Sequence, residues 1–422
     1  MSARCKERET SKGQETSRNK RFDTKLYLIL VTPHAIMRTF QQTRPVPADE
    51  FRISPIVFKI PHLALTVAGV VSFAICLCIV LTKGWHGVHT LDSDDGVQKI
   101  HAEPTPRIGG IAIYVGMLAG WWLAPPEIAV LLGPMLIAVA PAFIAGVLED
   151  VTKRDSVRER LLATFASGLL AWWLTGISLN HIHLWGVDYL LGFVPISVLF
   201  TAFALAGVAN AVNIIDGLNG LASGTVLLCL TALGLIALLA GDAEMAKVCF
   251  VLGGATCGFM VVNYPGGKIF LGDGGAYLLG FLLGWVAVMV AVRNPTTSAW
   301  APLLACGYPI LEVLFSIARR HARTLHVGHP DRLHLHSLLW ARVARKAFRG
   351  RSAMVQNAAV LPMILLYSLI PVVLAITFRR NTAALIAGFL ACGYLYALIY
   401  SRLVHFSWTW PKLRPARQGT SV

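Results

Sequence analysis

Long apolar runs separated by short polar segments dominate the chain from residue 61 onward. A helix that spans the hydrocarbon core of a bilayer needs about 20 mostly apolar residues. Pro125-Pro126 and Gly241-Asp242 each divide a longer apolar stretch, which favours two helices in each place. The pattern predicts an all-α, polytopic integral membrane protein of about eleven transmembrane helices, at residues 61–82, 108–124, 127–148, 159–177, 188–209, 221–240, 245–262, 275–293, 299–318, 356–378 and 382–400.

The composition supports this class. Hydrophobic residues make up 55% of the 422 residues and charged residues 14%, with a mean hydropathy of +0.62. A soluble domain carries about 25% charged residues. The net charge of +15 would also suit a nucleic-acid-binding protein, but the basic residues lie in short loops and tails, where they set membrane orientation. We therefore expect membrane lipids as partners and no nucleic acid.

The chain divides into three regions. Residues 1–52 are polar and basic, and their apolar stretch at 26–31 is too short for the core of a signal peptide. We interpret this region as a disordered extension, or as an upstream extension of the gene model. Residues 53–405 form the transmembrane domain and residues 406–422 a basic tail. Seven of the eight cysteines lie in apolar runs, without a CxxC pair, so disulfides and cysteine metal sites are not expected.

The distribution of Lys and Arg predicts the orientation. With eleven spans, every second loop lies on the same side of the membrane as the C-terminus. These loops and the C-terminal tail carry roughly 21 Lys and Arg, and the other loops carry four, which indicates that the former face the cytoplasm. The basic N-terminal region contradicts this, because the same topology places it outside. The expected cytoplasmic loops are 83–107, 149–158, 210–220, 263–274 and 319–355.

The predicted spans are nearly free of charge. Glu312 is the one acid well inside an apolar run, and it lies nearer the cytoplasmic end. Ion-coupled transporters usually keep acids or histidines near the bilayer midplane. The sequence therefore disfavours a transporter.

Each expected cytoplasmic loop contains a polar segment that suits a phosphate substrate or a divalent cation. In the first, two prolines stiffen the chain and two glycines allow a close approach of the backbone to a ligand. Lys99 and Arg107 could hold a phosphate there, although an ordinary juxtamembrane turn explains the segment equally well. In the second, the pair Glu149-Asp150 ends an apolar run. It could bind a cation, provide a base or only solvate the helix end.

The third segment is the most specific of the five. Asn213 and Asp216 are three residues apart, so on a helix they share one face. Glycines beside them permit a sharp turn. So polar a cluster between two apolar helices favours a functional role, with Asn210, Asn213, Asp216 and Asn219 as the candidates.

The fourth and fifth segments add a lone acid and a pair of histidines. Asp273 is bracketed by glycines at the start of a predicted helix, where it could bind a hard cation beside phosphate oxygens or simply cap the helix. His334 and His336 follow Arg332 and face the same way if the segment is extended. No cysteine or third clustered acid completes a zinc site. Contacts to phosphate or sugar are therefore favoured.

Together these segments resemble the polyprenyl-phosphate N-acetylhexosamine-1-phosphate transferases. The resemblance covers about residues 61–400. It rests on a Pro-Thr-Pro-Arg-x-Gly-Gly turn, an acidic pair, an Asn-x-x-Asp-Gly-x-x-Gly-Leu-Ala segment, a Gly-Asp-x-Gly segment and a His-x-His loop. The order of the segments and their confinement to one side of the membrane also match.

The resemblance implies a reaction. An oxygen of undecaprenyl phosphate attacks the β-phosphorus of a UDP-N-acetylhexosamine, UMP leaves, and a lipid-linked sugar diphosphate forms. The enzyme would lie in the bacterial cytoplasmic (inner) membrane with its active site facing the cytoplasm. Whether it forms a homodimer stays open.

The resemblance also implies roles for the candidate residues. Asp273 would be the main ligand of Mg²⁺, with Mn²⁺ as an alternative, and Asp216 would serve the nucleotide and metal region. Asp150, with Glu149 beside it, would lie near the attacking phosphate, by direct attack or through a covalent intermediate. The two loop histidines and Arg332 would contact the donor diphosphate or sugar.

Three departures from the family pattern narrow the interpretation. The family's acidic pair is usually Asp-Asp with a further Asp three residues later, whereas this chain has Glu149-Asp150 and Lys153. The second Asp of the usual Asp-Gly-x-Asp-Gly is Asn219 here. Ser337 follows His336, so the triple-histidine form of the peptidoglycan translocase is missing. We therefore favour a glycan-initiating transferase that uses UDP-GlcNAc.

Two alternatives remain. The same reaction with another UDP-N-acetyl sugar, such as a deoxyhexosamine, would need the same residues, and only donor competition separates the two. A carrier or flippase for polyprenyl phosphate would not need Asp216 and Asp273 aimed at one pocket. It should keep its activity when Asp273 becomes Asn.

Overall fold

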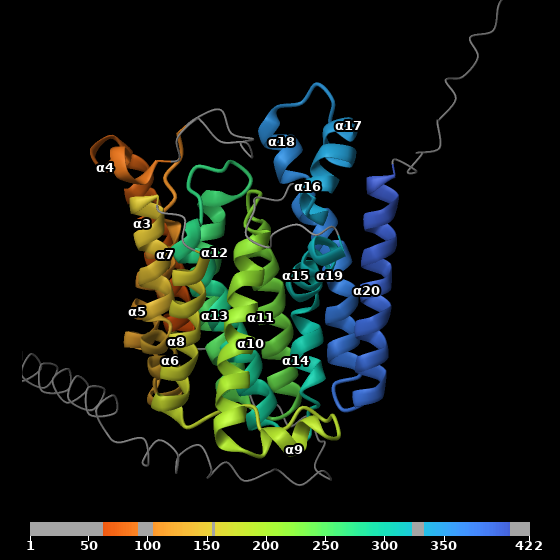
Figure 1. The fold of residues 1–422 in the computed structure, drawn as a ribbon. Helices are drawn as coiled ribbons and strands as arrows, with labels where there is room; N and C mark the ends of the chain where they lie inside the picture. The colour runs from red at the N-terminus through yellow and green to blue at the C-terminus, as the bar shows by residue number, and fades with distance from the viewer. Residues whose placement is uncertain (1–61, 92–103, 154–156, 323–332, 406–422) are drawn as a thin grey trace, which may run out of the picture.

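The computed structural model describes residues 62–91, 104–153, 157–322 and 333–405, which form a bundle of helices (Figure 1). The predicted regions 1–52 and 406–422 lie outside the described residues. The helices are α3 His62–Leu81, α4 Lys83–Thr90, α5 Gly109–Leu123, α6 Pro126–Ala138, α7 Ala140–Thr152, α8 Val157–Thr175, α9 Val187–Leu191, α10 Val194–Ile215, α11 Leu221–Leu239, α12 Ala243–Asn263, α13 Gly272–Arg293, α14 Trp300–Ala305, α15 Gly307–Ala322, α16 Leu335–Leu339, the π-helical turn Trp340–Ala344, α17 Arg345–Ala347, α18 Ala353–Ala358, α19 Val360–Thr377 and α20 Thr382–Val404.

The helices confirm an all-α, polytopic membrane protein. Seven helices of the described residues are long and apolar enough to cross a bilayer, or eight if α6 and α7, bent by 46°, form one span. Helices also lie at the other predicted spans: α5 has 15 apolar residues, α8 begins with charged residues, and α14 with α15 fills 300–322. The total of about eleven spans stays a prediction.

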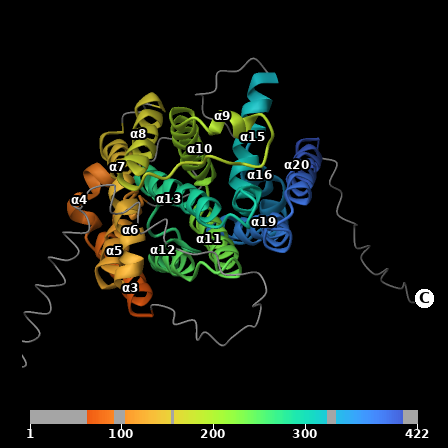
Figure 2. The ribbon, with the colours of Figure 1, turned by 90° about the horizontal axis from the view of Figure 1, so that it is seen from below.

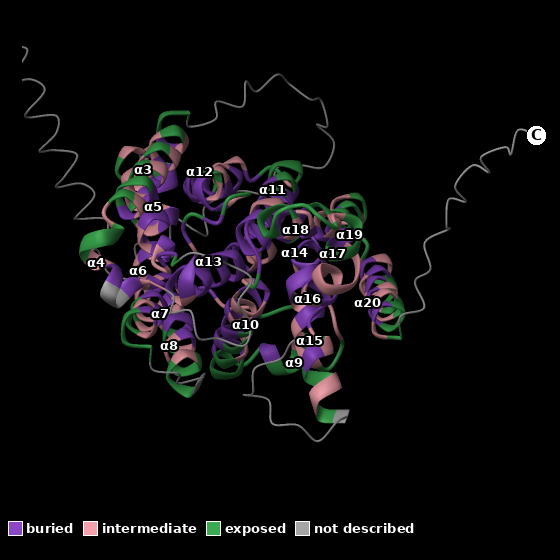
Figure 3. Cartoon of the chain, turned by 90° about the horizontal axis from the view of Figure 1, so that it is seen from above, coloured by how far each residue is buried: buried purple, intermediate pink, exposed green. Residues whose placement is uncertain are grey.

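Helix α13 runs through the middle of the bundle, where the two end-on views place it among α7, α10, α11 and α12 (Figures 2 and 3). Of its most apolar window, 83% is buried by the protein. Glycines allow this packing, because a Cβ on Gly110 of α5 would lie 2.4 Å from Gly275 Cα, and one on Gly146 of α7 would lie 2.6 Å from Gly274 Cα. Small residues let helix backbones approach closely in membranes, so these glycines bring three helices together at the start of α13.

The periphery of the bundle is apolar and exposed. Only 17% of the corresponding window of α20 and 28% of that of α3 are buried. Leu390, Tyr394, Trp173 and Phe203 are among the exposed side chains, and Figure 3 shows exposed and half-buried residues on the outer faces of α20 and α8. An exposed apolar face of this size suits contact with lipid chains.

One predicted span is wrong in its boundaries. The sequence placed it at 188–209, but residues 187–191 form the separate helix α9 and α10 runs from Val194 to Ile215. Asn210 and Asn213 therefore lie in the last turns of a helix, not in a loop. The polar turn proper is 216–220. Hydropathy alone ends the predicted span at the first asparagine. The helix continues past it, and the amide of Asn213 donates a hydrogen bond within the protein.

Candidate active site

The polar segments converge at the end of the bundle that carries α4 and α16, which is the upper end in Figure 1. Backbone hydrogen bonds join the first segment to the fourth: Phe270 N–H donates to Pro106 O at 2.8 Å, and Gly109 N–H to Phe270 O at 3.0 Å. Gly272, at a φ of +75°, lies so close that a Cβ there would be 2.0 Å from Arg107 O. Glycine is therefore required at this position, and Arg107 is held against the start of α13.

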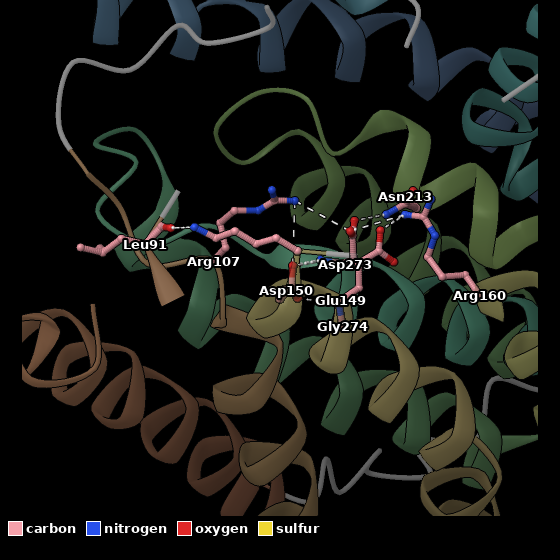
Figure 4. A network of polar contacts seen from close by, with 9 residues as sticks. Leu91, Arg107, Glu149, Asp150, Arg160, Asn213, Asp273 and Gly274 are labelled. Carbon is pink, nitrogen blue, oxygen red and sulfur yellow. Dashed lines mark hydrogen bonds and ion pairs between the residues drawn. The ribbon is translucent and has the colours of Figure 1, made fainter. Parts of the chain in front are cut away.

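Asp150 caps the N-terminus of α13. Its Oδ1 accepts from Asp273 N–H at 2.9 Å, and its Oδ2 accepts from Gly274 N–H at 2.9 Å (Figure 4). The residue is 6% exposed. The first turn of a helix has unpaired N–H groups and a partial positive charge, so a buried carboxylate is stabilised there. Both oxygens of Asp150 are thus occupied by the backbone that carries Asp273.

Asp273 lies between two arginines and an amide. Asn213 Nδ2 donates to Asp273 Oδ1 at 2.7 Å, whereas Arg160 and Arg107 approach Oδ2 at 3.5 Å and 3.9 Å. Arg160 also pairs with Glu149 at 2.7 Å. Figure 4 shows these side chains around one carboxylate. The orientation of Asp273 is fixed by Asn213, while its second oxygen has only long contacts to two cations.

Asp216 ends α10 in the polar turn and is half-buried. Burial raises the pKa of its carboxyl to about 7. Arg107 opposes this rise in the pKa, and the carboxylates of Asp273 and Asp150 add to it. The three acids are therefore close enough to repel one another, and Arg107 is the cation that they share.

Asn219 holds the polar turn in place. Its backbone N–H donates to Asn357 Oδ1 at 2.9 Å and its side chain to Pro265 O at 3.1 Å. Asn263 accepts from Gly220 N–H at 2.6 Å. The side chain of Asn219 is 3% exposed, so the contacts that it makes here connect protein segments.

The two histidines lie in a different local structure from the one expected. His334 has extended backbone, but His336 is inside α16, so the segment is not an extended strand. Their rings are nevertheless stacked, with centroids 5.5 Å apart and planes at 1°. His334 Nδ1 lies 3.0 Å from Glu312 Oε1. A Cβ on Gly217 would be 2.8 Å from His336 Nε2, so α16 packs on the polar turn.

Comparison with known proteins identifies the arrangement. The model of glycosyl transferase family 4 matches residues 132–291, which include most of α13 and the acids at its start. Over these residues the chain is similar to glycosyl transferase family 4.

Several curated transferases are similar over more than half of the chain. A probable undecaprenyl-phosphate N-acetylglucosaminyl 1-phosphate transferase of Bacillus subtilis is 27% identical, over 58% of this chain and 68% of the relative. A decaprenyl-phosphate N-acetylglucosaminephosphotransferase of Mycobacterium leprae is 28% identical, over 72% and 80%. A phospho-N-acetylmuramoyl-pentapeptide-transferase of Moorella thermoacetica is 29% identical, over 53% and 72%.

The site contains most of the residues that the sequence singled out. Asp150, Glu149, Asn213, Asp273 and Arg107 share one network. Asp216 lies beside it. Asn219, His334 and His336 border it through the polar turn, and Asn210 lies half-buried one turn before Asn213. Lys99 and Arg332 lie outside the described residues.

Two residues of the network were missed as site candidates. Arg160 bridges Glu149 and Asp273, but in the sequence it falls inside a predicted span and only adds to the basic count. Asn357 binds the turn from a distant helix. An arginine one turn into an apolar helix was the available signal for Arg160, because a charge there needs a partner. Lys153, where the family usually has an acid, donates to Leu91 O at 3.1 Å.

The residues present fit Mg²⁺. Among the described residues, no group of three His, Cys, Asp or Glu side chains is arranged to hold a metal alone. Mg²⁺ is usually bound through one or two carboxylates together with substrate phosphates. Asp273 Oδ2 has only long contacts, and Asp216 is half-buried and carries a raised pKa. The donor set therefore suits a cation that arrives with a diphosphate.

Proposed function

We propose that the chain transfers N-acetylglucosamine-1-phosphate from UDP-GlcNAc to undecaprenyl phosphate and so starts a lipid-linked cell-envelope glycan. An oxygen of the acceptor phosphate forms a bond to the β-phosphorus of the donor. The bond from that phosphorus to the bridging oxygen breaks, and UMP leaves with the electron pair. The observation that carries this proposal is the carboxylate of Asp273, fixed by Asn213 and approached by Arg107 and Arg160 at the start of the central helix.

Charge neutralisation is the main task of such a site. Both substrates are anionic, and two unit charges 4 Å apart repel by about 4 kcal/mol at an effective dielectric constant of 20. Arg107 has a side chain that is 39% exposed and lies 3.9 Å from both Asp150 and Asp273. It can therefore turn from these acids to a phosphate oxygen. Arg160 is held by Glu149 at 2.7 Å and stays in place.

Asp150 supports direct attack by the acceptor. A phosphate monoester is already ionised near neutral pH, so the step needs no strong base. Both oxygens of Asp150 accept backbone N–H groups of α13, and a covalent intermediate on this residue would disrupt at least one of these hydrogen bonds. We therefore assign Asp150 to positioning the start of α13, and with it Asp273.

Asp273 and Asp216 would hold Mg²⁺. When bound, the ion would neutralise phosphate charge and stabilise the charge that develops on UMP. Asn213 keeps Asp273 in the orientation needed to meet it. Mn²⁺ would serve the same oxygen ligands.

The location of the site supports its orientation in the cell. UDP-sugars are cytoplasmic, and the acceptor presents its phosphate at the membrane surface. The residues of this site lie in or next to the basic loops that the sequence assigns to the cytoplasm. We propose that the protein lies in the bacterial cytoplasmic membrane with this end facing the cytoplasm.

A membrane assay with UDP-GlcNAc, undecaprenyl phosphate and Mg²⁺ tests the proposal. The expected result is UMP release that requires both substrates and the metal, and that is lost in Asp216→Asn. No UMP from any UDP-N-acetyl sugar, together with an Asp216→Asn variant that behaves like the parent, would contradict it. The non-catalytic carrier predicts that Asp273→Asn keeps the parent's activity.

Donor competition tests the sugar. The relatives that the chain resembles include N-acetylglucosamine enzymes and a muramoyl-pentapeptide enzyme at nearly equal identity, so similarity alone does not select the donor. We expect UDP-GlcNAc to be used in preference to UDP-deoxyhexosamines. Preferred turnover of a UDP-deoxyhexosamine would contradict the proposed donor sugar, while the proposed type of reaction would stand.

A further inference from the structure

Glu312 is a buried acid that the proposed chemistry does not use. It lies in α15, is 0% exposed, and was the one acid well inside an apolar run of the sequence. Burying a carboxylate is costly unless it is paired and hydrogen-bonded. Its partners therefore indicate why the chain retains it.

Those partners are in the histidine segment. Glu312 Oε1 lies 3.0 Å from His334 Nδ1 and accepts the backbone N–H of Leu335 at 3.3 Å. A carboxylate that is ionised can only accept hydrogen bonds. His334 must therefore donate from Nδ1, which leaves Nε2 as its other functional atom.

The pairing belongs to a polar stripe on α15. Glu312, Ser316 and Arg319 are four and three residues apart, so they share one face of the helix. Ser316 Oγ lies 3.3 Å from His334 Nδ1 and accepts from Arg319 Nη2 at 3.1 Å. Arg319 Nη1 donates to the carbonyl of Leu333, directly before His334. All three side chains of this stripe hold the same short segment.

The segment in turn borders the catalytic turn. The ring of His334 is stacked on that of His336, and His336 is packed against Gly217, the residue after Asp216. His336 is 3% exposed and its Nδ1 has no hydrogen-bond partner among the described residues. Burial lowers the pKa of His336 to about 4, so the neutral ring is the form packed there.

We propose that Glu312 is a positioning residue of the transferase, which acts through His334 to hold the stacked imidazoles against the Asp216–Gly217 turn. This inference rests on the proposed function. Glu312 touches no substrate in it. The residue fixes the tautomer and the orientation of His334, and through the ring stack it fixes the place of the turn that carries Asp216.

The test uses the full-length protein in detergent with Glu312→Gln, His334→Gln and the double variant. Misplacing a reacting group by about 1 Å can lower a rate about 100-fold, so we expect Glu312→Gln to lower kcat up to about 100-fold. The KM for UDP-GlcNAc should change less than kcat. Because Glu312 acts through His334, the double variant should be no slower than His334→Gln alone.

The matched control is Asp242→Asn, the same change from acid to amide at a buried position of the opposite end. It should lower the melting temperature and leave kcat near that of the parent. Separate effects of Glu312→Gln and His334→Gln that multiply in the double variant would overturn the proposal, as would a Glu312→Gln enzyme with parental kcat.

A spectroscopic arm keeps the outcome clear. In the protein with ¹⁵N-labelled histidine, the resonance lost in His334→Gln should show protonated Nδ1, and Glu312→Gln should shift it. An unprotonated Nδ1 in the parent overturns the proposal whatever the activity. If the parent releases no UMP, the proposed function fails and the inference fails with it, whereas an active parent with unchanged Glu312→Gln refutes the inference alone.

Discussion

The two ends of α13 have similar charged groups and use them differently. At its C-terminal end, Arg293 binds Asp242 through two hydrogen bonds of 2.6 and 2.8 Å, and Asp242 also caps α12. At its N-terminal end, the cations approach Asp273 at 3.5 and 3.9 Å. The first end is a closed, bidentate pair that connects two helices. The second has ionic contacts loose enough to be exchanged for substrate and metal.

The difference teaches how a structural charge pair can be told from a functional one. Bidentate pairs with short bonds are the strong ones, and both partners at the C-terminal end are nearly buried. At the N-terminal end the tight contacts go to groups that orient Asp273, such as Asn213 and Asp150, and the weak contacts point to the position of a ligand.

The largest effect is expected for Asp273→Asn. The change removes the proposed metal ligand, and we expect UMP release to fall about a thousandfold. Thermal stability should change little, because the ion pairs that it loses are long. The measurements are single-turnover UMP release and a thermal melt of the same sample. If Asp273→Asn lowered the melting temperature and kept the parental rate of UMP release, the N-terminal end of α13 would be structural rather than functional.

The next largest effect is expected for Asp242→Asn at the other end. Removing one partner of a buried ion pair typically destabilises a protein by about 3–5 kcal/mol. Arg293 would be left buried with Glu244 at 3.9 Å as its remaining carboxylate. The melting temperature should fall while the rate per folded molecule is retained. Asp242→Asn combined with Arg293→Gln should recover part of the loss, because no charge is left unpaired.

Substituting a glycine of the central contact should have a smaller effect. In Gly110→Ala the new Cβ would lie 2.4 Å from Gly275 Cα, and overpacking typically costs about 1–3 kcal/mol. Because α5 also carries the backbone next to Arg107, the rate should fall together with stability. Gly207→Ala on α10 is the control, since nothing lies within 4 Å of its Cβ. Equal effects of the two variants would show that the close contact is unimportant.

The smallest effect is a dependence on pH through Asp216. Its pKa is about 7 in the folded protein, so lowering the pH through 7 protonates the carboxylate that the metal and nucleotide region needs. Below pH 7, kcat/KM at limiting Mg²⁺ should fall about tenfold per pH unit. A profile that is flat between pH 5.5 and about 7.5 would contradict this.

The same pKa has a consequence for stability. The folded carboxyl has its pKa raised above the ordinary 3.8, so between these values the native state binds more protons than the unfolded one. Without Mg²⁺, this group therefore lowers stability as the pH rises from about 4 to 7. Thermal melts at pH 6 and pH 8, with and without Mg²⁺, check this, and added Mg²⁺ should offset the loss at pH 8. The Asp216→Asn variant should show a weaker dependence.

Much of this fold follows from apolar periodicity. Helices lie at every predicted span because a run of about 20 apolar residues has few other solutions in lipid. The boundaries were less predictable, and 188–209 was displaced because the apolar residues of α9 were joined to α10. In physical terms, hydropathy measures the transfer of side chains to lipid. It does not show that the chain changes direction between α9 and α10, or that the amide of Asn213 has a hydrogen-bond partner within the protein.

The candidate site was predictable in residue type and less so in role. Asp273, Asp216 and Asp150 were found because acids are rare in this apolar chain, with 22 Asp and Glu among 422 residues. The capping by Asp150 and the contact of Arg160 with Asp273 join residues that are far apart in the sequence. Asp150 and Gly274 are separated by 124 positions, and Arg160 and Asp273 by 113. A single sequence contains no information on such pairings. Glu312 and His334 are only 22 residues apart, but their pairing was also missed, because the sequence does not show that the segment after α15 folds back onto it.

The burial of α13 also bears on how the family can diverge. Its most apolar window is 83% buried by protein, whereas that of α20 is 17% buried and otherwise meets lipid. A lipid-facing position accepts almost any apolar side chain, since acyl chains rearrange around it. A position on α13 meets fixed neighbours, so its replacements must fit their shapes. We therefore expect random substitutions to abolish function more often along α13 than along α20. The sequence of α20 should vary more than that of α13 among homologues that share this chemistry.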